Sequence, residues 1–387
     1  MIFLVSFFLI LSWKPLWCSV WQLFYSKINN KFKIILFGTF FISDIHRYSF
    51  ILSLFKNTFG AKKNKFNNDI TFIGNAIVDI IAETSDELLT ELDIPKGGMQ
   101  LINTKTADKL IDSIRAPLVV SGGSAANTAV GFSSFGGKAC FIGQTGLDEF
   151  GDLFSKDINK SNVFFQNKTS KMLDKTSKSI ILVTPDAERS MSTFLGASVK
   201  FNINSINEDL ITNSKLLYIE GYLFDQPEAK KAIYHCCRLA KDKNIQIAFS
   251  LSDLFCVERH RNDFLNLIVE YVDIIFANEE EIKNLYQSNL NDCIQLIQSD
   301  VEMGAITLGS RGSFVFETKK EHIINSVAVK SLVDTTGAGD MFAAGFLYGY
   351  MYKHSIEECG NLGSKAAAEI IQYYGARPKT LLKSLIN

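Results

Sequence analysis

The residues with the clearest chemical use lie near the C-terminal end, in Asp-Thr-Thr-Gly-Ala-Gly-Asp at positions 334–340. The small residues Gly337, Ala338 and Gly339 allow the backbone to approach a ligand closely. An apolar helix is predicted to begin near Gly339, and the N–H groups and positive dipole end of a helix start attract a phosphate. Asp340 could there accept a proton from a substrate hydroxyl. The motif predicts phosphoryl transfer by positioning and charge stabilisation, with a plain strand-to-helix turn as the alternative.

Three further motifs are weaker when each is taken alone. Asn278-Glu279-Glu280-Glu281 is typical of a helix start, where acidic residues are common in the first turn. The run from Thr307 through Gly309 to Gly312 fits a β-turn, and Arg189 fits a surface arginine. A functional interpretation of these three motifs depends on their occurring together with the 334–340 motif.

The elements that must position these residues alternate between short apolar runs and amphipathic stretches. Strands are predicted at 70–73, 77–81, 139–142, 179–183, 216–220, 245–250, 274–277 and 305–308, and helices at 227–243 and 279–288. Strands alternating with helices predict a parallel sheet covered on both faces. In such sheets ligands bind beyond the carboxyl ends of the strands, at a switch in strand order. We therefore expect each motif to follow a strand directly.

Two segments break the alternation. Residues 79–102 and 177–195 carry β-like runs with turn residues, Lys96-Gly97-Gly98 in one and Pro185-Asp186 in the other. We interpret them as a small β lid over the site, because lids exclude water during phosphoryl transfer. A catalytic domain is expected over residues 69–387.

Composition sets limits on function. The 387 residues carry a formal net charge of −1, so the chain as a whole has no general affinity for nucleic acid. Nearly half the residues are apolar, as in a globular protein with a sizeable core. The seven cysteines include no C-x-x-C pair, which argues against a disulfide framework or a cysteine metal site. Reduced thiols in a cytoplasmic protein are the expectation.

Residues 1–65 have a hydrophobic and basic character. Up to position 69 there are nine Lys or Arg against two Asp. The apolar run at 2–13 is short of the roughly 20 residues that span a bilayer, and the apolar stretch at 34–55 contains charges. A hydrophobic anchor, a targeting segment and a nonessential extension all remain open. Membrane association of the catalytic domain itself is not expected.

Two signatures together resemble the ribokinase/PfkB carbohydrate kinase family. One is the 334–340 motif, and the other is Gly-Gly-Ser-Ala-Ala-Asn-Thr-Ala at 122–129, with glycine-containing runs at 135–137 and 143–148. The likeness covers roughly residues 69–380. It implies a ribokinase-like three-layer α/β sandwich with a parallel-dominated sheet and a small β lid. It also implies an enzyme that transfers phosphate from ATP, with Mg²⁺, to an alcohol group.

The resemblance also implies roles for single residues at the phosphate end of the site. Asp340 would be the catalytic base, and the amides of Gly337, Ala338 and Gly339 would hold the γ-phosphate. Asn278 and Glu281 would organise Mg²⁺ through its waters, since hard oxygen ligands suit that ion. The remaining assignments are Thr307, Gly309, Gly312 and Arg189 at the nucleotide, and Asp334 and Thr336 at a monovalent cation such as K⁺.

Several stretches are most similar to adenosine kinase-like members of the family. Asn75 and Asp79 would bind the ribose, Gly122, Gly123 and Asn127 would face the sugar, and Tyr222 would stack on adenine. Tyr222 could equally be a core residue. Glu220 and Thr193 depart from the pattern, since a small residue and Ala are common there.

The expected reaction is therefore phosphorylation of the 5′-hydroxyl of adenosine to AMP. A sugar kinase acting on ribose, fructose or 2-keto-3-deoxygluconate is the alternative within the family. A nucleoside-binding protein without turnover is the alternative from another class. A small molecule is the expected partner, and the sequence leaves a monomer and a homodimer equally open.

Overall fold

The computed structural model describes residues 22–28, 31–37, 68–165, 174–186 and 188–386. The chain divides into two compact units, residues 1–65 and 66–387. The first contains an antiparallel hairpin of β1 (Gln22–Ile28) and β2 (Lys31–Phe37). Most of what the sequence suggested for residues 1–65 falls outside the described residues. Within the described ranges, no helix combines the length and apolar character needed to cross a membrane.

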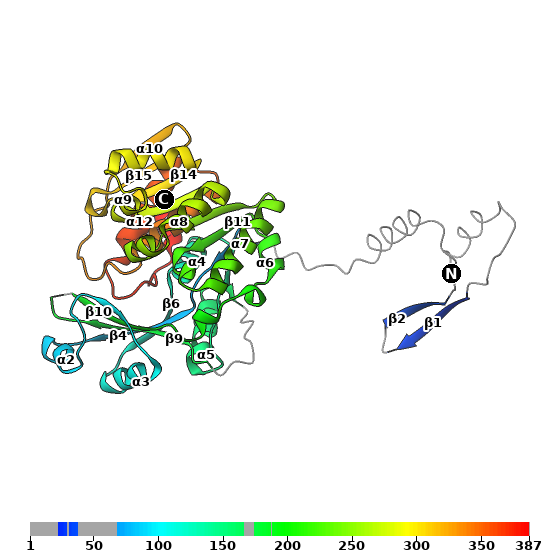
Figure 1. Cartoon of the computed structure of the whole chain (residues 1–387), viewed down its shortest axis with the longest axis horizontal. Coiled ribbons are helices and arrows are strands. Elements are labelled where there is room, and N and C mark those ends of the chain that lie inside the picture. The colour runs from blue at the N-terminus through cyan, green and yellow to red at the C-terminus, as the bar shows by residue number, and fades with distance from the viewer. Residues whose placement is uncertain (1–21, 29–30, 38–67, 166–173, 187, 387) are drawn as a thin grey trace. The chain divides into compact units, whose positions relative to one another are not determined.

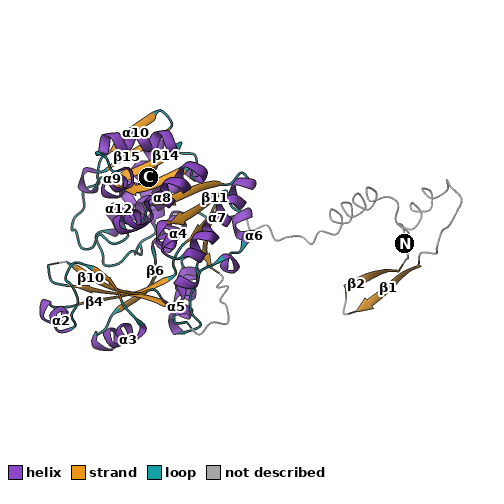
Figure 2. Ribbon diagram, viewed as in Figure 1, coloured by secondary structure: helices purple, strands orange, loops and turns teal. Residues whose placement is uncertain are grey.

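The second unit is built on a nine-stranded sheet, which Figure 2 shows between layers of helices. Its order is β16-β15-β14-β13-β12-β11-β3-β7-β8, and all neighbours from β14 to β8 are parallel. The strands are β3 (Ile70–Ile73), β7 (Ala139–Ile142), β8 (Val163–Phe165), β11 (Leu216–Glu220), β12 (Gln246–Ser250), β13 (Ile274–Asn278), β14 (Met303–Thr307), β15 (Ser313–Glu317) and β16 (Lys320–Ile324). The predicted parallel-dominated α/β sheet is confirmed. Strand β8 and the antiparallel strands β15 and β16, of which β16 is the edge strand, were not predicted.

Both faces of this sheet are buried, which explains why its strands are almost wholly apolar. In β11, Leu216 and Tyr218 point into one core cluster, and the alternate residues Leu217 and Ile219 point into the other. The helices of the first cluster are α4 (Ser124–Phe135), α5 (Glu149–Lys160), α11 (Ala338–Met351) and α12 (Ile356–Ile370). Those of the second are α6 (Glu208–Thr212), α7 (Pro227–Asp242), α8 (Leu254–Tyr271), α9 (Glu279–Tyr286) and α10 (Leu290–Asp300).

The strand order switches at β3. From β3 the chain continues outward to β7 and β8 on one side, whereas β11 and the later strands extend the sheet on the other. The carboxyl ends of β3 and β11 therefore border the crevice where such sheets bind ligands. The site must be sought around the residues that follow Ile73 and Leu216–Glu220.

A second, five-stranded sheet forms the small β lid, in the order β5-β10-β9-β4-β6. Its strands are β4 (Ile77–Glu83), β5 (Met99–Leu101), β6 (Leu118–Gly122), β9 (Ser177–Val183) and β10 (Arg189–Phe194). Helices α2 (Asp86–Glu91) and α3 (Thr104–Ser113) cover the face turned away from the main sheet (Figure 1), packing on Ala82, Ile180 and Leu182.

Two elements of the lid were not predicted. Between the β-like runs of segment 79–102, Ser85 accepts a hydrogen bond from the Leu88 amide and starts α2. The strand β6 lies outside both predicted segments, yet it pairs antiparallel with β4 and leads directly into α4. A strand of five residues ending in Gly122 offers little periodicity to detect.

The expectation that every motif directly follows a strand is also wrong in one place. The segment 334–340 comes after an irregular stretch that begins beyond Ile324, the end of β16. Because β16 is the edge strand, the chain must travel from the edge of the sheet back to α11 before the motif begins. A long connection is needed there in place of a strand-to-helix turn.

Candidate active site

Asp340 lies in the first turn of α11, facing the first turn of α4. The hydroxyl of Ser124 donates to Asp340 Oδ1 at 2.7 Å, and the amide Nδ2 of Asn127 donates to Oδ2 at 3.0 Å. The two signatures, more than 200 residues apart in the chain, therefore meet at one carboxylate. Burial raises the pKa of Asp340, while the two hydrogen bonds and the charge of Arg377 act in the opposite direction. Ser124 belongs to the quoted signature, but the sequence analysis gave it no role.

The start of α11 has room for a ligand. Gly337 has φ 77°, and a Cβ there would lie 2.5 Å from the Cβ of Ala376, so both backbone conformation and packing require glycine. A Cβ at Gly339, by contrast, would meet no atom within 4 Å. Gly339 is exposed, as is expected where backbone amides face an open space. Helix α11 begins at Ala338, so these amides belong to an anion-attracting helix start.

Two of the residues predicted to bind the substrate, Asp79 and Gly122, lie in strands of the lid. Asp79 is buried in β4, and a Cβ at Gly122 would lie 2.1 Å from its Oδ2, so Gly122 leaves space for that carboxylate. A Cβ at Gly123, with φ 95°, would lie 2.2 Å from the carbonyl oxygen of Asn75. Burial raises the pKa of Asp79 to about 7, with Arg377 acting against it and Asp340 adding to it.

The side-chain oxygen of Asn127 is an acceptor without a donor among the described residues. The side chain is only 4 % exposed, and within the described part of the chain its Oδ1 has no hydrogen-bond partner. A buried acceptor without a donor is costly, so its presence beside Asp340 points to a ligand that supplies a hydroxyl or amino group. The neighbouring Nδ2 is already committed to Asp340.

The structure explains why a glutamate can occupy position 220, where a small residue is common. This carboxylate at the end of β11 is fully buried and accepts hydrogen bonds from the amides of Asn75, at 2.7 Å, and Ala125, at 2.8 Å. A Cβ at Gly74 would lie 2.3 Å from its Oε2, so glycine there makes room for the larger residue. Burial raises the pKa of Glu220 to about 7. Glu220 ties the end of β3 to the start of α4.

Asn278 and Glu281 form a reciprocal capping box at the start of α9. The amide of Glu281 donates to Asn278 Oδ1 at 2.9 Å, while the backbone N–H and Nδ2 of Asn278 donate to the two carboxylate oxygens at 2.8 and 2.6 Å. Asn278 is exposed and Glu281 is buried, and burial raises the pKa of Glu281 to about 7. The motif therefore starts a helix, as its sequence indicated, and the helix start places the Asn278 amide next to the Glu281 carboxylate.

This pair suits Mg²⁺ only with help from a ligand. No group of three or more His, Cys, Asp or Glu residues in the described ranges is arranged to hold a metal. Mg²⁺ commonly uses one or two carboxylates together with waters and substrate phosphates. One buried carboxylate next to an exposed amide fits that kind of site.

The turn from Thr307 to Gly312 joins β14 to β15. Gly309 has φ 62° and Gly312 has φ 91°, and a Cβ at Gly312 would lie 1.9 Å from the carbonyl oxygen of Ile324. Leu308 N donates to Gly312 O at 2.8 Å, which closes the turn. An ion pair between Arg311 and Glu279 links this turn to the first turn of α9. The turn residues and the capping box of α9 are therefore neighbours, as the nucleotide prediction requires.

Arg189 lies in the lid but reaches the 334–340 segment. Its Nη1 lies 3.0 Å from Asp334 Oδ1, and its Nη2 donates to the Thr335 hydroxyl at 2.9 Å. Asp334 also accepts hydrogen bonds from the amide and hydroxyl of Thr336 and from the amide of Gly375. Both carboxylate oxygens of Asp334 are engaged, with a guanidinium as counterion. The monovalent cation site at Asp334 and Thr336 stays a prediction, and so does contact of Arg189 with ATP phosphates.

Tyr222 follows β11 in a short 3₁₀ turn, Gly221–Asp225. Its ring packs partly against the second core cluster, and its hydroxyl donates to Ser252 O at 3.4 Å. Burial raises its pKa, with Asp253, Cys256 and Asp340 among the lesser causes. The tyrosine is therefore partly a core residue at the ligand edge of the sheet. Stacking on a base stays a prediction.

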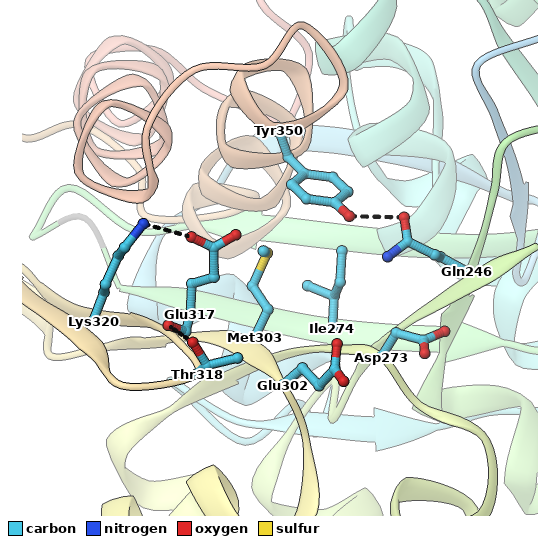
Figure 3. A pocket seen from close by; sticks show the side chains of 9 residues that line it. All are labelled: Gln246, Asp273, Ile274, Glu302, Met303, Glu317, Thr318, Lys320 and Tyr350. Carbon is cyan, nitrogen blue, oxygen red and sulfur yellow. Dashed lines mark hydrogen bonds and ion pairs between the residues drawn. The ribbon is translucent and has the colours of Figure 1, made fainter.

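A separate hollow of about 320 Å³ lies at the opposite edge of the main sheet. Figure 3 shows its wall, where Tyr350 bonds to Gln246 and Lys320 faces Glu317. Gln246, Ile274 and Met303 stand at the amino ends of β12, β13 and β14, so none of the predicted site residues lines it.

Comparisons with known proteins agree with this geometry. The pfkB family carbohydrate kinase profile matches residues 99–382. The structure is similar to that of adenosine kinase from Sinorhizobium meliloti, with 42 % identity, a TM-score of 0.77 and coverage of 82 % of this chain and 98 % of that one. A probable sugar kinase from Rhizobium etli CFN 42 gives 41 % identity, the same TM-score and coverage of 82 % and 97 %. Adenosine kinase from Saccharomyces cerevisiae is 26 % identical over 329 residues, which are 79 % of this chain and 95 % of that protein.

The family profile spans well over half of the chain, and relatives above 40 % identity share the fold along nearly their whole length. Adenosine kinases and sugar kinases both occur among these relatives. The chain belongs to the pfkB family of carbohydrate kinases.

Proposed function

We propose that this protein transfers the γ-phosphate of ATP to the 5′-hydroxyl of adenosine, giving ADP and AMP. The observation that carries the proposal is the position of Asp340, in the first turn of α11 with Ser124 and Asn127 of α4 bonded to its two oxygens. A base fixed at an anion-binding helix start is what in-line transfer to a hydroxyl requires.

The described side chains divide the work as follows. The substrate hydroxyl lies against Asp340, which takes its proton as the new P–O bond forms and the bond from the γ-phosphorus to the bridging oxygen of ADP breaks. The amides of Gly337, Ala338 and Gly339 hold the transferred phosphoryl group. Glu281 and Asn278 would hold Mg²⁺ through its waters, and the ion would offset the phosphate charge.

The acceptor side favours a ribose. Asn75, Asp79 and the free Oδ1 of Asn127 offer acceptors for paired hydroxyls. Gly122 and Gly123 bring the backbone close to these groups, since larger residues would collide with Asp79 and Asn75. Thr307, Gly309, Gly312 and Arg189 are assigned to the nucleotide, and Asp334 and Thr336 to a monovalent cation.

Two observations favour adenosine over a free sugar. Tyr222 stands at the carboxyl end of β11 with part of its ring open, where it could stack on a base. A relative at 42 % identity is an adenosine kinase. A sugar kinase is the second candidate, because a relative at 41 % identity is described as a probable sugar kinase. We assign the activity to residues 69–387 and give no role to residues 1–65.

The test is ADP formation by the full chain with MgATP and adenosine, inosine, guanosine, ribose, fructose or 2-keto-3-deoxygluconate. Turnover with adenosine alone supports the proposal. Turnover with a free sugar alone replaces adenosine by that sugar. Binding of adenosine without turnover by any compound would show a binding protein and contradict the assigned role of Asp340.

A further inference from the structure

A half-buried arginine that no signature contains lies beside the site. Arg377 follows α12 in the C-terminal stretch, and its guanidinium donates three hydrogen bonds. Nε donates to Ser121 O at 2.7 Å, Nη1 to Ala126 O at 2.9 Å and Nη2 to Ser121 Oγ at 3.0 Å. These acceptors stand on either side of Gly122 and Gly123. The arginine therefore clamps the turn from β6 into α4.

The clamp also reaches α5. The amide and hydroxyl of Ser121 both donate to Asp157 Oδ2, at 2.9 and 2.6 Å. The Ser121 hydroxyl thus accepts from Arg377 and donates to Asp157. One guanidinium holds together the end of a lid strand, the start of a core helix and, through a hydroxyl, a second helix.

The charge of Arg377 has no direct counterion within the described residues, where all three of its hydrogen bonds end on neutral oxygens. A guanidinium that is partly removed from water and bonded only to neutral groups is costly unless nearby charges compensate it. Asp79 of β4, Asp157 of α5 and Asp340 of α11 act on Arg377 in this way. Burial lowers the pKa of Arg377 to about 10, so the side chain stays charged at neutral pH.

We propose that Arg377 is the positioning residue of this site, whose guanidinium fixes the β6–α4 turn and whose positive charge favours the ionised form of the Asp79 and Asp340 carboxylates. Only the kinetic part of this inference depends on the proposed function. The other titratable and charged groups around these two carboxylates are Asp334, Glu220, Tyr218 and Tyr222. Among the residues that the structure describes, Arg377 is the cation that lowers the pKa of both Asp79 and Asp340.

The direction of the pH effect follows from Asp79. Its pKa is about 7 in the fold against 3.8 for an unperturbed aspartate side chain, so the native state binds more protons between these values. The free energy of unfolding therefore falls as pH rises through 7. Removing the charge of Arg377 raises the native pKa of Asp79 and Asp340 further, and this fall must then continue to higher pH.

The experiment compares Arg377→Gln, Arg377→Lys and the matched control Arg261→Gln by urea unfolding of the full chain from pH 5 to 9. Arg261 also donates to neutral acceptors, the carbonyl and side-chain oxygens of Asn284. In Arg377→Gln, the fall in the free energy of unfolding should continue to a pH roughly one unit higher than in wild type, because a nearby opposite charge shifts a carboxylate pKa by about that much. Arg377→Lys should keep the wild-type midpoint of the pH-dependent fall in stability. Arg261→Gln should give a plot of stability against pH that is parallel to that of wild type. An equal loss of stability at every pH in Arg377→Gln would reduce the arginine to a structural clamp.

The same variants have a kinetic readout. With adenosine and MgATP, the acid limb of kcat/KM in Arg377→Gln should move up by about one pH unit, and Arg377→Lys should raise KM without moving that limb. If wild type shows no turnover, the proposed function fails while the unfolding curves still test Arg377. If Arg377→Gln does not fold, Arg377→Lys provides the test. A shifted midpoint of the pH-dependent fall in stability, although the charge is retained, would overturn the electrostatic role of Arg377.

Discussion

The two edges of the main sheet both gather carboxylates, but in different ways. At the carboxyl edge, Asp340 and Glu220 accept hydrogen bonds from groups on distant elements. At the amino edge, Glu302 is exposed and Glu317 faces Lys320 on the next strand. The amino edge has a hollow of about 320 Å³ (Figure 3), whereas the carboxyl edge has two helix starts and the glycines Gly74, Gly122 and Gly123, where a Cβ would collide with neighbouring atoms.

The hollow and the proposed active site therefore lie at opposite edges of the sheet. Carboxylates at the carboxyl edge stay in costly surroundings because amides, hydroxyls and one guanidinium hold them there. At the amino edge, Glu302 is solvated and Glu317 has a surface ion pair, which contributes little. Each prediction below pairs a change at the first edge with a matched change at the second.

The largest effect is expected from Asp340→Asn. Removing the base should lower kcat by about 10²- to 10⁴-fold, because a positioned proton acceptor contributes on that scale. Ser124 can still donate to the new side chain, so circular dichroism and adenosine binding should change little. The control is Glu302→Gln at the amino edge, which should keep wild-type turnover. Turnover retained in Asp340→Asn would remove Asp340 from the mechanism.

The next effect is expected from Gly122→Ala. The new Cβ would lie 2.1 Å from Asp79 Oδ2, and the displaced carboxylate should raise KM for adenosine at least about tenfold while overpacking costs about 1–3 kcal/mol. Gly304→Ala is equally crowded, with Ile275 Cγ2 at 2.5 Å, but lies in β14 near the amino edge. It should lose stability and keep its KM. Equal KM values in both variants would remove Asp79 from the acceptor site.

Tyr222→Ala tests the base-binding end of the same edge. Loss of stacking should raise KM for adenosine by about tenfold, since stacking of a base on an aromatic ring contributes about 1–3 kcal/mol. Tyr350→Ala, in the wall of the amino-edge hollow, loses the bond to Gln246 and should cost only stability. Steady-state kinetics with adenosine and with ribose separate the outcomes. If the two substrates suffer equally in Tyr222→Ala, the tyrosine is a core residue.

Much of the architecture could be predicted because it depends on local pattern. Buried parallel strands such as β3, β7 and β11 are short apolar runs, and their bounds agree with those predicted from the sequence. The edge strand β16 was missed because its residues are mostly polar or exposed, with Ile323 75 % exposed. Helix α2 was missed because turn residues surround it and its six residues are too few to show a period.

The candidate site was predictable where a motif carries it and unpredictable where only the fold does. Asp340, Gly337 and Gly122 belong to recognisable signatures. Arg377 lies in a C-terminal stretch without a recognised motif. Its neighbours in sequence do not indicate that it contacts Ser121, 256 positions earlier in the chain. Glu220 was noticed as a departure from the family pattern, but its partnership with Gly74 exists only in three dimensions.

The smallest effect is expected in the pH dependence of stability contributed by Glu220. Its pKa is about 7 in the fold against 4.5 for an unperturbed glutamate side chain, so it binds an extra proton between these values and its contribution to stability falls as pH rises through 7. Glu220→Gln cannot ionise, so urea unfolding between pH 5 and 8 should show a shallower fall than wild type.

The matched change at the amino edge is Asp273→Asn. Burial also raises the pKa of Asp273, and this carboxylate accepts the amide of Ile247 at 2.7 Å. Asp273→Asn should therefore also flatten the pH dependence of unfolding. Only Glu220→Gln should lower kcat/KM, because only Glu220 holds Asn75 and the start of α4 in place. If both variants keep full kcat/KM, the carboxyl edge tolerates a looser β3–α4 tie, and the contrast between the two edges then rests on Asp340, Asp79 and Arg377 alone.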